Sequence, residues 1–267
     1  MDSGSLSGVW TDLIGQEQVV ATLQRAVAAA GSGSTSRAMT HAWLITGPPG
    51  SGRSNAAKAF AAALQCRSGG CGECNACTTA LAGAHPDVTV VRTEQLSIGV
   101  DQVRELVRRA AMSPTLGRYQ VLVVEDADRI TERGADALLK SIEEPAARTV
   151  WLLCAPNPDD LVATVRSRCR RVELCTPSTV AITELLQRRD GIDEVTASYA
   201  ARVAQGHIGR ARVLARSEEA RQRRAEVLAL PGKLTTVGAC LRAAGELVET
   251  AAADAAAVTA ELDVRER

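Results

Sequence analysis

The sequence predicts an α/β domain with a parallel sheet, followed by a region that is entirely helical. Up to about residue 175, short apolar runs alternate with helical patterns, and this alternation is typical of parallel strands joined by helices. After Pro177 the strand patterns stop and only helical patterns follow. The length of 267 residues is enough for one large domain or for two smaller ones.

Five strands are expected in the first region. Four are continuous apolar runs, the pattern of parallel strands that are covered on both faces, and the last strand is shorter. The expected strands are His41–Thr46, Asp87–Arg92, Gln120–Glu125, Val150–Ala155 and Arg170–Leu174.

Helical patterns fill the segments between the strands and the region after them. Apolar residues recur at helical spacing over 19–27, 103–110 and 135–142, and Pro145 ends the last of these helices. Three short helices are then expected at 179–189, 193–204 and 209–216. From residue 217 the pattern is helical up to the final ELDVRER, which contains no helix stop signal, so we expect the sequence to end inside a longer helical domain.

Charge and composition exclude several classes of protein. Thirty-one basic residues balance thirty-one acidic ones, so no whole-chain charge indicates binding to nucleic acid or to a membrane. Aromatic residues make up 2% of the sequence, which argues against a stacking platform for single-stranded nucleic acid. No apolar run reaches the roughly 18 residues of a transmembrane helix, and the N-terminal residues lack the features of a signal peptide. The sequence thus predicts a cytoplasmic protein.

The segment GPPGSGRS, residues Gly47–Ser54, has the form of a phosphate-binding loop except at Arg53, where such a loop carries lysine. It lies between an expected strand and an expected helix, as such a loop requires. Ser54 could hold a magnesium ion, whereas arginine is longer and planar and does not replace the lysine. We expect nucleotide binding to survive better than hydrolysis. The alternative is a strand-to-helix turn without a ligand. The backbone N–H groups that would face phosphate oxygens depend on Gly47, Gly50 and Gly52.

The run QVLVVEDADRI is an apolar strand that ends in two carboxylates, Glu125 and Asp126. A strand that delivers acids beside a phosphate-binding loop commonly positions magnesium and the attacking water. The order Glu-Asp reverses the more usual Asp-Glu, so the side-chain lengths depart from those of a well-tuned site. Solvated acids at the end of a strand are the alternative interpretation.

Four cysteines within twelve residues form the strongest local signal: Cys66, Cys71, Cys74 and Cys77. In a cytosolic chain this spacing predicts a tetrahedral zinc site rather than disulfides. Because four thiolates leave no open position on the metal, the site is expected to be structural and to perform no catalysis. Cysteines that cluster without a metal are the alternative.

The tripeptide Ser167-Arg168-Cys169 follows a short helical segment and precedes the last expected strand. Together with Arg166, Arg170 and Arg171 it forms a basic cluster. Taken alone, such a cluster is more often a solvated face than a phosphate contact.

Five stretches together resemble the clamp-loader branch of the AAA+ family. They are VWTDLIGQEQVV, HAWLITGPPGSGRS, the four-cysteine segment, ALLKSIEEP and SRC, and their order and spacing cover nearly the whole chain. The resemblance implies an AAA+ P-loop domain at residues 1–175, with a zinc knuckle inserted at 66–77. It also implies a three-helix lid at 176–216 and the beginning of a helical collar domain at 217–267.

Three departures from the motor subunits of that branch fall on one chemical site. Arg53 replaces the loop lysine, Glu125-Asp126 replaces Asp-Glu, and Ala155-Pro156 stands where a polar sensor residue usually follows the fourth strand. The chain therefore resembles the type of subunit that keeps the loop as architecture and has lost independent ATP hydrolysis.

The resemblance also implies a role for Arg168. In this family the arginine of SRC projects into the ATP site of a neighbouring subunit, where it acts as an arginine finger. Arg210, in GHIGRA, falls near the lid arginine that senses nucleotide. The implied nucleotide site is degenerate and comprises Gly47, Gly50, Gly52, Arg53, Ser54, Glu125, Asp126 and Arg210.

The function implied by the resemblance is that of a stator-like clamp-loader subunit of the bacterial replicative DNA polymerase. Its partners would be the gamma/tau and delta subunits of a heteropentamer, the sliding clamp and primed DNA. Its cofactors would be a structural Zn2+ and, bound weakly or not at all, ATP or ADP with Mg2+. Two other functions remain open, an active ATP-hydrolysing motor subunit that tolerates Arg53 and a zinc-dependent nucleic-acid-binding module.

Overall fold

The computed structural model describes residues 6–31, 38–93 and 95–266. It divides into two units, residues 1–215 and 216–267, which are considered separately. The first unit contains a five-stranded sheet in the order β2-β3-β4-β1-β5, and every neighbouring pair is parallel. The strands are β1 Ala42–Thr46, β2 Val88–Val91, β3 Gln120–Val124, β4 Thr149–Ala155 and β5 Arg170–Glu173.

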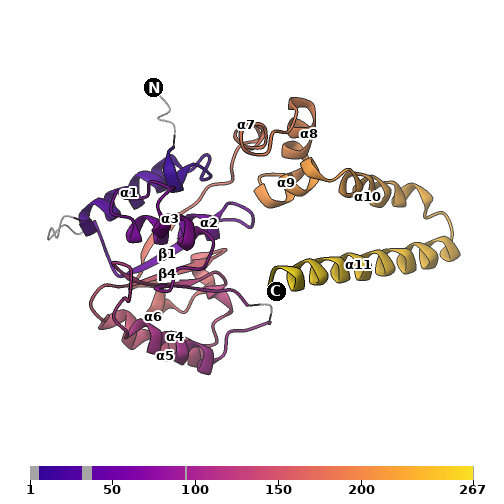
Figure 1. Cartoon of the computed structure of the whole chain (residues 1–267). Helices are drawn as coiled ribbons and strands as arrows, with labels where there is room; N and C mark the ends of the chain where they lie inside the picture. The colour runs from indigo at the N-terminus through magenta and orange to yellow at the C-terminus, as the bar shows by residue number, and fades with distance from the viewer. Residues whose placement is uncertain (1–5, 32–37, 94, 267) are drawn as a thin grey trace. The chain divides into compact units, whose positions relative to one another are not determined.

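All five predicted strands are present, and the predicted parallel α/β fold is confirmed. Helices cover both faces of the sheet, with α1, α2 and α3 on one side and α4, α5 and α6 on the other (Figure 1). These helices are α1 Glu17–Gly31, α2 Arg53–Gln65, α3 Asn75–Leu81, α4 Val100–Ala110, α5 Glu132–Glu143 and α6 Ala163–Arg166.

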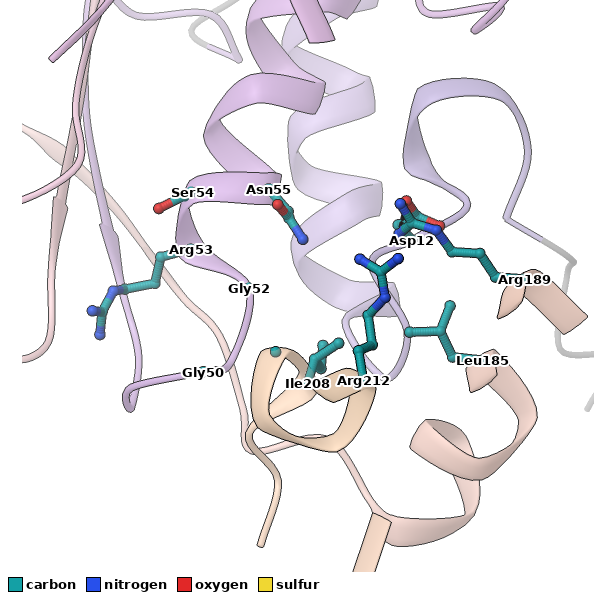
Figure 2. A pocket seen from close by; sticks show the side chains of 11 residues that line it. Asp12, Gly50, Gly52, Arg53, Ser54, Asn55, Leu185, Arg189, Ile208 and Arg212 are labelled. Carbon is teal, nitrogen blue, oxygen red and sulfur yellow. Dashed lines mark hydrogen bonds and ion pairs between the residues drawn. The ribbon is translucent and has the colours of Figure 1, made fainter. Parts of the chain in front are cut away.

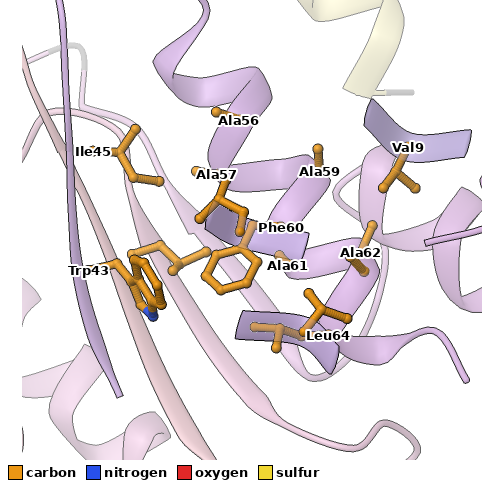
Figure 3. Packing of buried hydrophobic residues seen from close by; sticks show 14 of the residues in the cluster. Val9, Trp43, Ile45, Ala56, Ala57, Ala59, Phe60, Ala61, Ala62 and Leu64 are labelled. Atoms are coloured by element: carbon orange, nitrogen blue, oxygen red, sulfur yellow. The ribbon is translucent and has the colours of Figure 1, made fainter. Parts of the chain in front are cut away.

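The alternation of side chains along β1 divides the core into two clusters. Trp43 and Ile45 pack with α1 and α2, whereas Ala42 and Leu44 pack with α4, α5 and α6. On the first face, the Trp43 and Phe60 rings meet edge to face with centroids 5.1 Å apart (Figure 3). Much of the buried surface of α2 is alanine, and these small side chains let the helix lie close to the sheet.

Three short helices complete the first unit: α7 Thr179–Asp190, α8 Glu194–Ala204 and α9 Ile208–Arg216. Side chains cap all three. Ser178 accepts a hydrogen bond from the Ala181 N–H, Asp193 accepts one from the Thr196 N–H, and Nδ1 of His207 accepts one from the Arg210 N–H. Gly191 ends α7 in the left-handed conformation. The three helical patterns expected after Pro177 are thus observed within one residue of their predicted ends.

The second unit consists of α10 Glu218–Ala229 and α11 Val237–Glu266, joined through a short 3-10 turn at Leu230–Lys233. The prediction that the chain is helical from residue 217 onward therefore agrees with the structure. None of the described helices is long and apolar enough to cross a membrane.

Asp87 fixes the loop that leads into the interior strand β3. Asp87 is only 1% exposed. Its carboxylate accepts hydrogen bonds from the backbone N–H groups of Thr115, Leu116 and Gly117 at 2.5–2.8 Å. Burial by itself would raise the pKa of Asp87, but the three N–H donors outweigh it and lower the pKa below its ordinary value. The loop is therefore held by a buried charge.

We expect Asp87→Asn to destabilise the first unit by about 2–3 kcal/mol at neutral pH, because one backbone donor loses its acceptor and the others lose a charged one. Since the pKa of Asp87 is lowered by folding, its contribution is present above the unfolded pKa of about 3.9 and is lost as the pH falls through the folded pKa. Urea unfolding at a series of pH values measures this effect. Asp101→Asn, on the exposed face of α4, is the matched control, and a deficit in Asp87→Asn no larger than in this control would contradict the account.

Candidate functional site

The loop between β1 and α2 has the backbone geometry of a phosphate-binding loop. Gly50 and Gly52 have φ values of 83° and 97°, a conformation that glycine adopts without strain. Helix α2 begins at Arg53, so its unpaired N–H groups face the loop. The Gly47 N–H is tied to the Pro156 carbonyl at 3.3 Å, so the position predicted to lack a sensor side chain supports the loop through its backbone.

A pocket of about 330 Å3 lies against this loop. Its walls come from the loop and start of α2, from the N-terminal segment and from helices α7 and α9 (Figure 2). The lining residues are Asp12, Gly50, Gly52, Arg53, Ser54, Asn55, Leu185, Arg189, Ile208, Gly209 and Arg212.

Helix α9 packs directly on the loop. The Ile208 N–H donates a hydrogen bond to the Gly50 carbonyl at 3.3 Å. A Cβ atom on Gly50 would lie 2.3 Å from Cγ of His207, so this position accepts only glycine. The loop and the helices after Pro177 thus form one continuous wall of the pocket.

Arg53 does not extend into the pocket as a loop lysine would. Its guanidinium Nη1 donates to the Gly47 carbonyl and so folds back on the loop itself. In Figure 2 the side chain points away from Asn55 and Arg212. The donors of Arg53 therefore satisfy the protein's own backbone.

Both carboxylates after β3 also have partners within the protein. Lys58, on α2, places its Nζ 2.9 Å from Oε1 of Glu125, whose side chain is 10% exposed. Oδ2 of Asp126 accepts a hydrogen bond from the Thr93 N–H at 3.3 Å. Neither acid lines the pocket. These contacts stabilise the edge of the sheet and occupy groups that a magnesium site would need.

Arg212, rather than Arg210, lines the pocket. Its Nε and Nη2 bind both oxygens of Asp190, at 3.0 and 3.1 Å, and this paired geometry fixes the plane of the guanidinium. Beside it, Arg189 Nη1 lies 2.5 Å from Oδ2 of Asp12. Both of these arginines are therefore paired with a carboxylate, and only the guanidinium donors left over from these pairs could contact an anionic ligand.

The four predicted metal-ligating cysteines come together, and their geometry fits a metal. All four sulfur atoms lie within 4.8 Å of one another, and Sγ of Cys66 is 3.7 Å from the sulfurs of both Cys71 and Cys74. A tetrahedral zinc ion with Zn–S bonds of about 2.3 Å requires S–S separations of about 3.8 Å. Burial opposes ionisation of Cys66, but the backbone N–H groups of Cys71, Gly70 and Ser68 outweigh it and lower the pKa of that thiol to about 6. Burial raises the pKa of the Cys77 thiol, so zinc would displace a proton from it on binding. With that proton displaced, the four cysteines could bind zinc as a closed set of thiolates.

The cysteine knuckle holds the N-terminal segment in place. The Val9 N–H donates to the Gly70 carbonyl at 3.1 Å, and a Cβ atom on Gly8 would lie 2.0 Å from the same oxygen. A few residues later this segment supplies Asp12 to the pocket. The knuckle is therefore linked to the pocket wall through a short, tightly packed piece of backbone.

Arg168 lies far from these groups in the fold. It follows α6 and precedes β5, at the amino end of the strands, whereas the loop and the acids follow the carboxyl ends of β1 and β3. Its side chain is 40% exposed. The structure thus brings Arg53 and Ser54 together at the pocket and keeps Arg168 apart from them.

Comparison with known proteins assigns the chain to a family. The model of the family described as DNA polymerase III, delta subunit, matches residues 15–178. The chain belongs to this family. One relative, the DNA polymerase III subunit delta' of Pseudomonas aeruginosa, is 41% identical over 55% of this chain and 47% of its own length. The chain thus spans about half the length of such curated relatives, and the delta-prime type of subunit agrees with the resemblance found in the sequence.

Other relatives carry a different subunit name. The DNA polymerase III subunit gamma/tau of Mycobacterium bovis is 34% identical over 60% of this chain and 27% of its own length. Among solved structures, a RuvB mutant from Thermotoga maritima matches with a TM-score of 0.56 and 16% identity, covering 89% of this chain and 72% of its own. This likeness confirms the AAA+ fold.

Two residues at the candidate site of this chain, Lys58 and Arg212, were not identified from the sequence. Lys58 follows Ser54 by four residues and so lies on the same side of α2, a spacing that could have indicated its contact with Glu125. Arg212 lies two residues beyond the predicted Arg210, and only the packing of α9 on the loop distinguishes them.

We expect the purified chain to contain one zinc ion, and Cys74→Ala to lose it and to lower the thermal unfolding midpoint by several degrees. Because Gly70 anchors Val9, amide hydrogen exchange should also rise in residues 8–12. Metal analysis and hydrogen exchange measure the two effects. Cys240→Ala, an exposed thiol outside the cluster, is the control. The prediction would be contradicted if the wild-type chain contained no metal and residues 8–12 exchanged no faster in Cys74→Ala than in wild type.

Proposed function

We propose that this chain is a clamp-loader subunit of the bacterial DNA polymerase III that does not itself hydrolyse ATP. It acts as a stator that supplies Arg168 to the ATP site of a neighbouring subunit. The family assignment and the relatives named delta' and gamma/tau support a role in that polymerase. Its partners are then gamma/tau and delta subunits, a sliding clamp and primed DNA, with the second unit contributing to the collar that joins them.

The observation that carries this proposal is the position of Arg168 relative to the chain's own loop. Strand β5 runs parallel to β1, with Arg170 opposite Trp43 and Glu173 opposite Thr46. Arg168 precedes the amino end of this pairing, and the phosphate-binding loop follows its carboxyl end. At about 3.3 Å per residue, the paired residues alone span about 10 Å, and both groups lie beyond them. An exposed arginine in this place serves a nucleotide held by another molecule.

The contacts at the loop support the absence of hydrolysis in this subunit. Arg53 binds the Gly47 carbonyl, Lys58 neutralises Glu125, and Asp126 binds the Thr93 N–H. A hydrolytic site needs a free cation at the phosphates and a free acid for magnesium or water. The pocket with Arg212 and Arg189 retains the means to hold a phosphate-bearing ligand, with Ser54 as the available magnesium ligand, so weak binding of ATP or ADP fits better than turnover.

Arg168→Ala in a reconstituted loader should abolish most of the DNA-stimulated ATP turnover. An arginine supplied in trans contributes about 10³–10⁵-fold at the site it enters, because it stabilises charge that develops on the transferred phosphoryl group. Steady-state ATPase assays with primed DNA and the clamp measure the loss. Arg171→Ala, an exposed arginine of β5 paired with Glu173, is the matched control and should retain turnover. Equal turnover of Arg168→Ala and Arg171→Ala would refute the proposal that Arg168 acts in the neighbouring ATP site.

Arg53→Lys should strengthen binding of ATP, by about tenfold, and add no turnover. The lysine is free to approach the phosphates, but Glu125 remains paired with Lys58. Calorimetric titration with Mg–ATP, together with turnover of the loader, separates the two effects. Arg25→Lys on the exposed face of α1 is the control. A gain of turnover that disappears in Asp126→Asn would instead favour an active motor subunit.

A further inference from the structure

We propose that Glu143 is a positioning residue for Arg168, holding the guanidinium ready for the neighbouring site. This inference rests on the proposed function of Arg168. Nη2 of Arg168 lies 2.6 Å from Oε1 of Glu143, which closes an ion pair between the end of α5 and the turn before β5. Nη1 donates to the Thr164 carbonyl at 2.8 Å and approaches Oγ of Ser167 at 3.4 Å. The guanidinium is thus held along one side, and its remaining donors are available to solvent or to a partner.

The helix alone does not account for an acidic side chain at position 143. Glu143 is the last residue of α5, where the unpaired carbonyl groups carry negative partial charge. A carboxylate there is unfavourable unless a cation compensates it, and Glu144 adds a second negative charge next to it. Arg168 supplies that compensation through its ion pair with Glu143. The pair therefore accounts for a carboxylate at this helix end.

The end of α5 is a rigid support. Nε2 of His41, which immediately precedes β1, donates to the Ile142 carbonyl at 2.6 Å, and the Trp151 indole N–H donates to Oγ of Ser141 at 3.2 Å. Ile142 itself is buried in the core with Val165 of α6. The backbone at Glu143 is therefore anchored to β1 and β4 through the two residues that precede it. The ion pair with Glu143 in turn fixes Arg168 relative to the sheet.

This rigidity matters because an arginine finger acts only in one geometry. A long exposed arginine samples many rotamers, and each rotamer that points elsewhere is lost to the neighbouring site. A carboxylate on a fixed helix end reduces the number of rotamers that the arginine samples before the subunits meet. This is preorganisation of a catalytic group. The predicted effect is on the rate of hydrolysis, and the affinity of the neighbouring site for ATP should remain unchanged.

The test compares Glu143→Ala, Glu143→Asp and Glu144→Ala in the reconstituted loader, with kcat and KM for ATP measured in the presence of primed DNA. We expect Glu143→Ala to lower kcat by about 10- to 100-fold with KM unchanged, since a small misplacement of a catalytic group costs about this much. Glu143→Asp should recover part of the loss, because it restores the charge. Glu144→Ala, which removes the adjacent acid, should behave as the wild type.

A double variant separates positioning from a merely structural role. If Glu143 acts through Arg168, Glu143→Ala has no further effect in an Arg168→Ala background. A further loss in that background, or a kcat for Glu143→Ala at or above the wild-type value while Arg168→Ala is inactive, would overturn the inference and leave the proposed function intact. Full turnover of Arg168→Ala itself would remove the proposed function and this inference with it. Equal thermal unfolding midpoints of Glu143→Ala and wild type support the inference, and a lowered midpoint with no fall in kcat overturns it.

Discussion

The parallel direction of all five strands is the constraint on which the rest of the structure depends. It collects the loop after β1, the acids after β3 and Pro156 after β4 at one edge of the sheet, while the segments before the strands gather at the other. The first edge holds a pocket for an anion. The second holds His41, the end of α5 and Arg168, so the loop and Arg168 lie at opposite ends of one domain.

The proposed absence of hydrolysis would follow from rearranged charges in an intact fold. The loop arginine binds its own backbone and Lys58 pairs with Glu125, so both charged groups have partners within the protein. Such contacts stabilise the domain, and each of them takes a group away from phosphate or magnesium. Restoring a single group would therefore leave the others occupied. The pocket persists because α9 and the N-terminal segment build its wall independently of these contacts.

The fold was largely predictable from the sequence, and the contacts at the site were not. Parallel strands covered on both faces have continuous apolar sequences, and helical patterns mark the short helices after Pro177. The four cysteines could be recognised as a set because ligand spacing is local. Ion pairs such as Lys58 with Glu125, or Glu143 with Arg168, join segments far apart in the chain and arise only from tertiary packing. The same reason accounts for Arg210, whose neighbour Arg212 faces the pocket once α9 has packed on Gly50.

The central claim is that this chain donates an arginine and does not hydrolyse ATP. It is tested most directly by a cryo-electron microscopy structure of the assembled loader on primed DNA, with a transition-state analogue of ADP and a metal fluoride. We predict the Arg168 guanidinium within about 2.9 Å of the analogue in the neighbouring subunit, and Arg53 still bound to the Gly47 carbonyl. An analogue held by Arg53 in this chain's own pocket, with Arg168 far from any nucleotide, would contradict the account.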